Sequence, residues 1–162
     1  AQCAESLERI GHKLEPRNEG RWLNFGVAGA GNCSGWTDSV PPLSGGLFAV
    51  NHLTYGDSDW RLIIPADLNP DTDCQGRVDR VGRCVSVDVP ERRFTEVALY
   101  DMEAAAIASF LQQRQRLSSL VVVKLVTDRS TDDPADGISI ARKLLRQNRD
   151  RIVAMAQRLA VA

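Results

Sequence analysis

This sequence of 162 residues has few of the side chains that build metal centres or nucleophilic triads. Histidine occurs only twice, as His12 and His52, which leaves little material for sites that need several imidazoles. The cysteines are widely separated along the chain and form no C-x-x-C pair. They are Cys3, Cys33, Cys74 and Cys84. We therefore expect no metal site, and we expect reduced cysteines in a cytoplasmic protein.

A charge excess of one sign and a long hydrophobic run are also lacking. The 20 basic and 21 acidic residues give a formal net charge of −1, which is not typical of nucleic-acid or anionic-membrane binders. No run approaches the roughly 20 apolar residues that a membrane span needs. Small molecules or other proteins are the favoured partners. Because the chain opens at Ala1 without methionine, we expect a processed chain or a fragment.

The hydrophobic content of 43% is enough for one buried core, and no linker, repeat or low-complexity segment divides the chain. We therefore predict a single domain over residues 1–162. Strands dominate the first half of the pattern, and strands alternate with helices in the second half. This order predicts an α/β fold, a three-layer sandwich with a mixed central sheet.

Hydrophobic periodicity and turn-forming residues predict the individual elements. In chain order these are a helix over Leu7–Leu14, a strand over Trp22–Val27, a hairpin of Leu47–Thr54 with Trp60–Ile64, one or two short strands within Val78–Val89, a helix over Asp101–Gln115, a buried strand over Leu120–Val126 and a helix over Gly137–Ala160. The basic residues of the last helix are expected on a solvated face, namely Arg142, Lys143, Arg146, Arg149 and Arg151.

A glycine segment, Gly26–Gly31, follows the first predicted strand. Glycines let backbone amides approach an anion or a sugar closely, so this segment is a candidate ligand-binding turn. Its G-x-x-G-x-G spacing differs from the dinucleotide fingerprint, and the lysine of a phosphate-binding loop is absent. A tight turn at a sheet edge is the alternative.

Two further segments carry carboxylates beside apolar runs. Asp101 and Glu103 open an alanine-rich segment, where they could serve as a helix N-cap and a first-turn acid, or where Glu103 could bind a vicinal diol such as that of ribose. Asp128 ends the strand over Leu120–Val126, and period-two alternation places it on the same face as Lys124. Structurally, these two residues could form an ion pair, or Asp128 could cap the loop that follows it. Functionally, Asp128 is an acid at the carboxyl end of a parallel strand, the usual place for ligand chemistry in open α/β sheets.

These three segments, together and in order, resemble motifs of the nucleoside phosphorylase and nucleosidase superfamily. They are Asn24-Phe25-Gly26-Val27-Ala28-Gly29, Asp101-Met102-Glu103-Ala104-Ala105-Ala106-Ile107-Ala108 and Val123-Lys124-Leu125-Val126-Thr127-Asp128. The resemblance implies a phosphorylase/hydrolase-like fold shortened at its N-terminus. It also implies cleavage of the N-glycosidic bond of a purine-type nucleoside, with no cofactor, with phosphate or water as the nucleophile, and in a homo-oligomer.

By this resemblance each motif has a role in such a reaction. Glu103 would bind the ribose hydroxyls and Met102 would pack against the sugar. Asp128 would assist departure of the base, with Thr127 beside it. The backbone near the nucleophile would come from Ala28, Gly29 and Ala30.

Members of the superfamily have several strands before the glycine segment, whereas about 20 residues precede Trp22 here. A nucleoside or nucleotide sensor without catalysis, or an assembly module, is therefore the alternative function.

Overall fold

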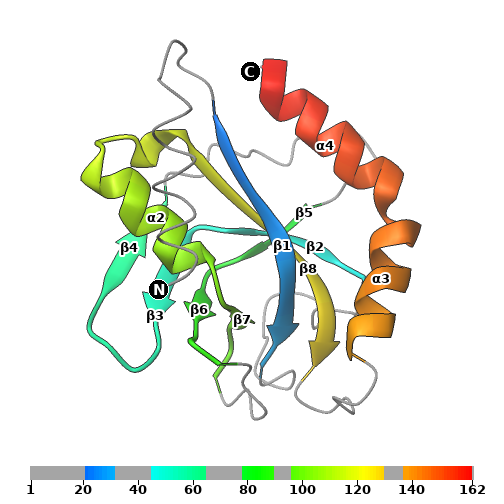
Figure 1. Ribbon diagram of the computed structural model, residues 1–162, viewed down its shortest axis with the longest axis horizontal. Coiled ribbons are helices and arrows are strands. Elements are labelled where there is room, and N and C mark those ends of the chain that lie inside the picture. Colours follow the sequence, from blue (N-terminus) through cyan, green and yellow to red (C-terminus); the bar gives the residue numbers. More distant parts are fainter. Residues whose placement is uncertain (1–20, 32–44, 65–77, 90–95, 130–136, 162) are drawn as a thin grey trace.

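The computed structural model describes residues 21–31, 45–64, 78–89, 96–129 and 137–161 of the chain. In this part of the chain a twisted sheet runs through the centre and helices lie on both of its faces (Figure 1). The predicted helix over Leu7–Leu14 lies outside the described residues.

The sheet has eight strands in the order β4-β3-β6-β7-β1-β8-β2-β5. Their bounds are β1 (Trp22–Ala30), β2 (Leu47–Val50), β3 (His52–Tyr55), β4 (Arg61–Ile63), β5 (Val78–Val81), β6 (Cys84–Ser86), β7 (Leu99–Asp101) and β8 (Leu120–Arg129). The β1–β8, β3–β6 and β6–β7 pairs are parallel, whereas β1–β7, β2–β8 and β3–β4 are antiparallel. The predicted mixed sheet is therefore confirmed.

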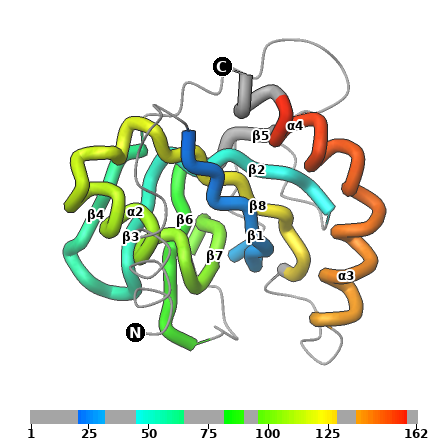
Figure 2. Tube along the Cα trace, turned by 45° about the horizontal axis from the view of Figure 1, so that its top comes forward, coloured from blue at the N-terminus to red at the C-terminus, as the bar shows by residue number. Residues whose placement is uncertain are grey.

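Helices on opposite faces complete the three layers. Helix α2 (Ala104–Gln113) covers one face and leads through a short 3-10 turn, η2 (Leu117–Ser119), into β8. Helices α3 (Gly137–Gln147) and α4 (Arg149–Val161) lie along the other side of the sheet (Figure 2). The predicted α/β sandwich is confirmed. No helix among the described residues is both long and apolar enough to cross a membrane.

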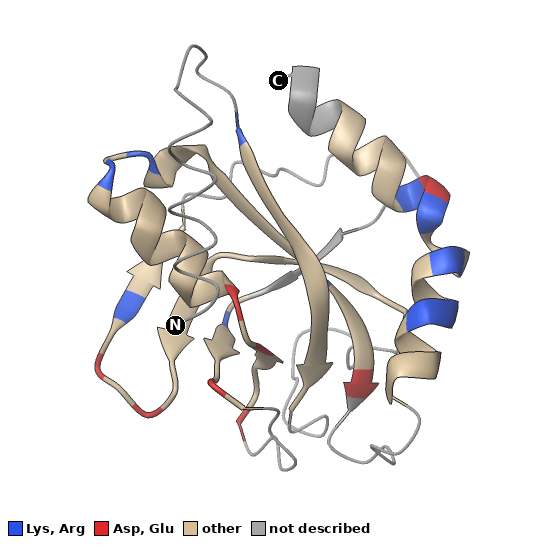
Figure 3. Ribbon diagram, viewed as in Figure 1, with Lys and Arg blue, Asp and Glu red and all other residues tan. Residues whose placement is uncertain are grey.

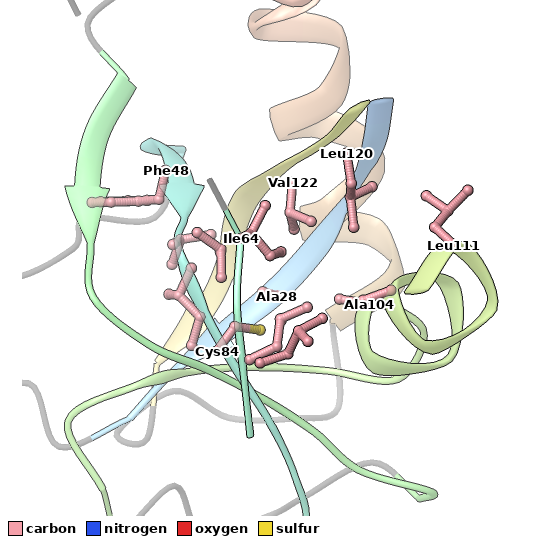
Figure 4. Packing of buried hydrophobic residues seen from close by; sticks show 14 of the residues in the cluster. Ala28, Phe48, Ile64, Cys84, Ala104, Leu111, Leu120 and Val122 are labelled. Atoms are coloured by element: carbon pink, nitrogen blue, oxygen red, sulfur yellow. The ribbon is translucent and has the colours of Figure 1, made fainter. Parts of the chain in front are cut away.

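Strand β8 separates two apolar clusters. Its residues Leu120 and Val122 pack into the main core with Ala104 and Leu111 of α2, as Figure 4 shows. The intervening Val121 and Val123 belong to a second cluster with Leu23, Phe25 and Met155. Burial on both faces explains why Leu120–Val126 is apolar apart from Lys124.

Two predicted elements are each divided in the structure. The strand expected over Leu47–Thr54 is two strands, β2 and β3, with Asn51 between them, and β2 pairs with β8 whereas β3 pairs with β4 and β6. The predicted hairpin therefore consists of β3 and β4 alone. The last helix is interrupted at Asn148, whose side chain donates to the carbonyl of Leu144 and accepts from Arg151. Such side-chain bonds to neighbouring groups compete with regular helix geometry.

The basic residues of α3 and the start of α4 form an exposed face, as expected (Figure 3). Arg142, Lys143, Arg146 and Arg149 are exposed. The prediction of a solvated basic face is confirmed for these four side chains.

Candidate functional site

The glycine segment is a strand in the structure. Strand β1 continues to Ala30, so the predicted turn over Gly26–Gly31 is wrong. The reason is that β1 lies between β7 and β8, and hydrogen bonds to these neighbours hold the backbone extended. One irregularity remains, a register shift between Ala28 and Gly29.

Gly29 brings the other two motifs together. Its Cα is paired with Tyr100 of β7 on one side and with Asp128 of β8 on the other. Neighbouring strands lie about 4.8 Å apart, so the backbones at Tyr100 and Asp128 are separated by about 10 Å across β1. Met102 and Glu103 follow within three residues of Tyr100. All three motifs therefore meet at one end of β1.

The side chains at this end differ in exposure. Met102 is 44% exposed, Glu103 is exposed and Asp128 is partly exposed, so a small molecule can reach all three. Thr127 is buried, and its hydroxyl donates a hydrogen bond of 2.8 Å to Oδ1 of Asp128. The remaining predicted site residues, Ala28, Gly29 and Ala30, lie between the two acidic segments and are buried.

Asp101 is the last residue of β7 and not part of the helix. The prediction that α2 begins at Asp101 is therefore wrong, because the N-cap position falls on Glu103. The capping interaction is nevertheless present, since Oδ2 of Asp101 accepts the backbone N–H of Ala104 at 2.9 Å. A carboxylate is favourable there because the N-terminus of a helix carries partial positive charge.

Lys124 pairs with Asp101 and not with Asp128, so of the alternatives for Asp128 the ion pair with Lys124 is wrong. Its Nζ lies 2.5 Å from Oδ2 of Asp101, and neither side chain is exposed. The register of β8 against β1 skips one residue before Asp128, so the alternation used for the prediction does not hold there.

Gly26 is the neighbour that makes room for this lysine. A Cβ at Gly26 would lie 3.1 Å from Nζ of Lys124. The glycine at this position therefore allows the ammonium group to lie over β1, a role that the motif alone does not suggest.

Ser86 is a polar residue of the site that the sequence analysis missed. Its hydroxyl donates to Oδ1 of Asp101 at 2.5 Å and accepts the backbone N–H of Ala105 at 2.9 Å. Ser86 lies in β6, which is beside β7 in the sheet, and no local pattern in the sequence connects it with Asp101.

Cys84 lies in the apolar core (Figure 4). Burial raises the pKa of the Cys84 thiol well above its usual value, and the negative charge of Asp101 raises it further, whereas Lys124 opposes the shift. A buried thiol in its neutral form is a poor nucleophile, so we assign no chemistry to it.

Among the residues that the structure describes, no group of three or more His, Cys, Asp or Glu side chains is arranged to hold a metal ion. The carboxylates at this end of the sheet lie at the ends of strands and at the start of α2 (Figure 3). This arrangement suits hydrogen bonding to hydroxyls and proton transfer to a leaving group.

Fold and site together define a phosphorylase/hydrolase-like α/β domain with acidic side chains at one end of its sheet. No family model and no curated protein matches the sequence. Solved structures of the same fold include 5′-methylthioadenosine/S-adenosylhomocysteine nucleosidases, members of the nucleoside phosphorylase and nucleosidase superfamily.

The nucleosidase of Neisseria meningitidis, solved with methylthio-immucillin-A, is 22% identical at a TM-score of 0.66, over 94% of this chain and 74% of that one. The Campylobacter jejuni nucleosidase is 14% identical at a TM-score of 0.64, over 96% and 75% of the two chains. The Chlamydia trachomatis protein is 20% identical at a TM-score of 0.62, over 94% and 72%, and it was also solved with adenine. At this identity the comparisons confirm the fold that the motifs imply.

Proposed function

We propose that this chain cleaves the N-glycosidic bond of a purine-type nucleoside. The observation that carries the proposal is the double pairing of Gly29, which brings Glu103 and Asp128 to one end of β1 from motifs 25 residues apart. The fold shared with structures of nucleosidases supports it.

The reaction requires stabilisation of positive charge on the sugar and protonation of the departing base, and carboxyl groups can provide both. As the bond between C1′ of ribose and the purine nitrogen breaks, its electron pair leaves with the base and positive charge develops on the sugar. Glu103 would accept hydrogen bonds from the ribose diol and stabilise that positive charge. Asp128 would donate a proton or hydrogen bond to the departing base, a contribution of about 10² to 10⁴ in rate.

The remaining residues have supporting parts in this proposal. Met102, exposed beside Glu103, would pack against the sugar. Thr127 would orient Asp128 through the hydrogen bond between their side chains. An oxygen of water or of phosphate would form the new bond to C1′, near the backbone of Ala28, Gly29 and Ala30. If water is the nucleophile, it loses a proton as free ribose is formed.

Base release from purified protein is the direct test. The protein would be incubated with adenosine, inosine and 5′-methylthioadenosine, with and without phosphate, and free base measured by chromatography. We expect release from at least one nucleoside. A requirement for phosphate would identify a phosphorylase, whereas release without it would identify a hydrolase.

Variants assign the roles. Asp128→Asn should lower kcat by about 10² or more. Glu103→Gln should raise KM for the nucleoside and also lower kcat, because the carboxylate both binds the ribose and stabilises the charge that develops on it. Asp57→Asn, in the exposed turn between β3 and β4, is the matched loss of one carboxylate and should change neither. If no free base is released from any of the nucleosides, the proposal that the chain is a nucleoside-cleaving enzyme is refuted. Binding without release, measured by calorimetry, would then indicate a nucleoside sensor.

A further inference from the structure

The N-terminus of α2 is held by a buried polar group that we call the Asp101 cluster. It comprises the side chains of Ser86, Asp101 and Lys124 and the backbone N–H groups of Ala104 and Ala105. Both oxygens of the Asp101 carboxylate are used, since Oδ1 accepts from Ser86, and Oδ2 accepts from Ala104 and lies beside Nζ of Lys124. The cluster therefore joins α2 to strands β6, β7 and β8 at one point.

In the sequence, Glu103 lies between Asp101 and Ala104, which both belong to this cluster and are both held by hydrogen bonds. Before it, Asp101 is held in the sheet, where it is paired with Ser86 and its carbonyl accepts the N–H of Val87 at 2.8 Å. After it, the N–H of Ala104 is bonded to the Asp101 carboxylate. Glu103 itself occupies the N-cap position but makes no side-chain cap hydrogen bond. Asp101 and Ser86 satisfy the first helical amides, which leaves the Glu103 carboxylate available for a ligand.

The buried ion pair of Lys124 and Asp101 has a high desolvation cost, so its presence suggests that it has a function. Taking a lysine and an aspartate fully out of water is expensive, and apolar residues of the same size are often at least as stable in such places. Here the chain keeps Lys124 completely buried and keeps a glycine at position 26, where a Cβ would crowd its ammonium group. Lys124 supplies the positive charge that compensates the Asp101 carboxylate.

We propose that Lys124, Asp101 and Ser86 are positioning residues. They hold Glu103 in the position from which its carboxylate can bind the ribose hydroxyls. This inference rests on the proposed function, in which Glu103 binds the ribose hydroxyls. All three side chains are buried, so their effect on ligand affinity passes through Glu103 and through the first turn of α2.

The test compares a ligand with ribose and a ligand without it. Dissociation constants for 5′-methylthioadenosine and for adenine would be measured by calorimetry on the wild-type protein and on Asp101→Asn. We expect Asp101→Asn to weaken 5′-methylthioadenosine binding roughly tenfold or more and adenine binding less than about twofold. Asp150→Asn, the loss of an acid in the first turn of α4, is the matched control and should change neither.

A second comparison shows whether the effect acts through Glu103. In a Glu103→Gln background, Asp101→Asn should cause little further loss of nucleoside affinity. Equal weakening of both ligands, or a full additional loss in the Glu103→Gln background, would show a general structural role and overturn the proposal. Should Asp101→Asn not fold, Ser86→Ala leaves the ion pair in place and should give the same pattern with a smaller loss.

Hydrogen exchange separates failure of this inference from failure of the proposed function. The amides of Ala104 and Ala105 should exchange faster in Asp101→Asn and in Ser86→Ala than in the wild-type protein. Unchanged exchange overturns the positioning role whatever the ligand. If the wild-type protein neither binds nor cleaves any nucleoside, the proposed function fails and the ribose role fails with it, while faster exchange still supports positioning of the α2 N-terminus.

Discussion

A Cβ on Gly26 would lie 3.1 Å from Nζ of Lys124, so the glycine of one motif and the lysine of another fit each other. Gly26→Ala should therefore lower the free energy of unfolding, although alanine is otherwise preferred to glycine within a strand by about 0.5–1 kcal/mol. Overpacking against an ammonium group held by Asp101 costs about 1–3 kcal/mol. Urea unfolding measures the difference. Gly82→Ala is the control, because nothing lies within 4 Å of a Cβ there; equal changes in the two variants would contradict the prediction.

Removing one partner of the buried pair should destabilise the protein strongly. Lys124→Met leaves the Asp101 carboxylate buried without its counter-charge, at a cost of about 3–5 kcal/mol in the free energy of unfolding. The double variant Asp101→Asn/Lys124→Met removes both charges and should be more stable than Lys124→Met alone. Denaturant unfolding of the wild-type protein, Lys124→Met, Asp101→Asn and the double variant checks this, and a double variant whose loss equals the sum of the two single losses would count against a direct pair.

The hydroxyl of Thr127 should support the activity of Asp128. Thr127→Val keeps the shape of the side chain and removes the hydrogen bond to Oδ1 of Asp128. One such bond is worth about 0.5–1.5 kcal/mol, so we expect kcat to fall roughly two- to tenfold, much less than in Asp128→Asn. Thr54→Val, another buried strand threonine, is the control. A kcat unchanged by Thr127→Val would remove Thr127 from the site.

Cys84 should be protected from alkylation in the folded protein. Its side chain is not exposed, and burial together with the charge of Asp101 raises the pKa of its thiol. Iodoacetamide at pH 8 should modify Cys84 only after denaturation, as mass spectrometry of the digested protein would show. Labelling of Cys84 in the native state would contradict the burial.

The same raised pKa predicts how stability depends on pH. The unfolded thiol ionises near its ordinary pKa of 9.0, whereas the folded thiol resists ionisation. The contribution of Cys84 to stability is therefore fully present below pH 9 and is lost as the pH rises above it. The free energy of unfolding should fall more steeply above pH 9 in the wild-type protein than in Cys84→Ala, and parallel pH profiles would contradict this prediction.

Local pattern in the sequence was enough to predict the elements and motifs that depend on neighbouring residues. The segment Leu120–Val126, apolar apart from Lys124, predicts a strand covered on both faces, and β8 is such a strand. The alanine-rich segment after Glu103 predicts a helix, and α2 is that helix, with Ala104 and Ala108 fully buried. The order of the three motifs implies the phosphorylase/hydrolase-like fold.

Only the tertiary structure decided which polar groups meet. Gly26–Gly31 has the composition of a turn, yet two neighbouring strands hold it extended as far as Ala30. Lys124 and Asp128 share a face by strict alternation, but a register shift beside Gly29 breaks that alternation and Asp101 comes from another strand. Strand pairing and bulges join residues far apart in the chain, so the partner of a buried charge depends on the assembled sheet and not on local spacing.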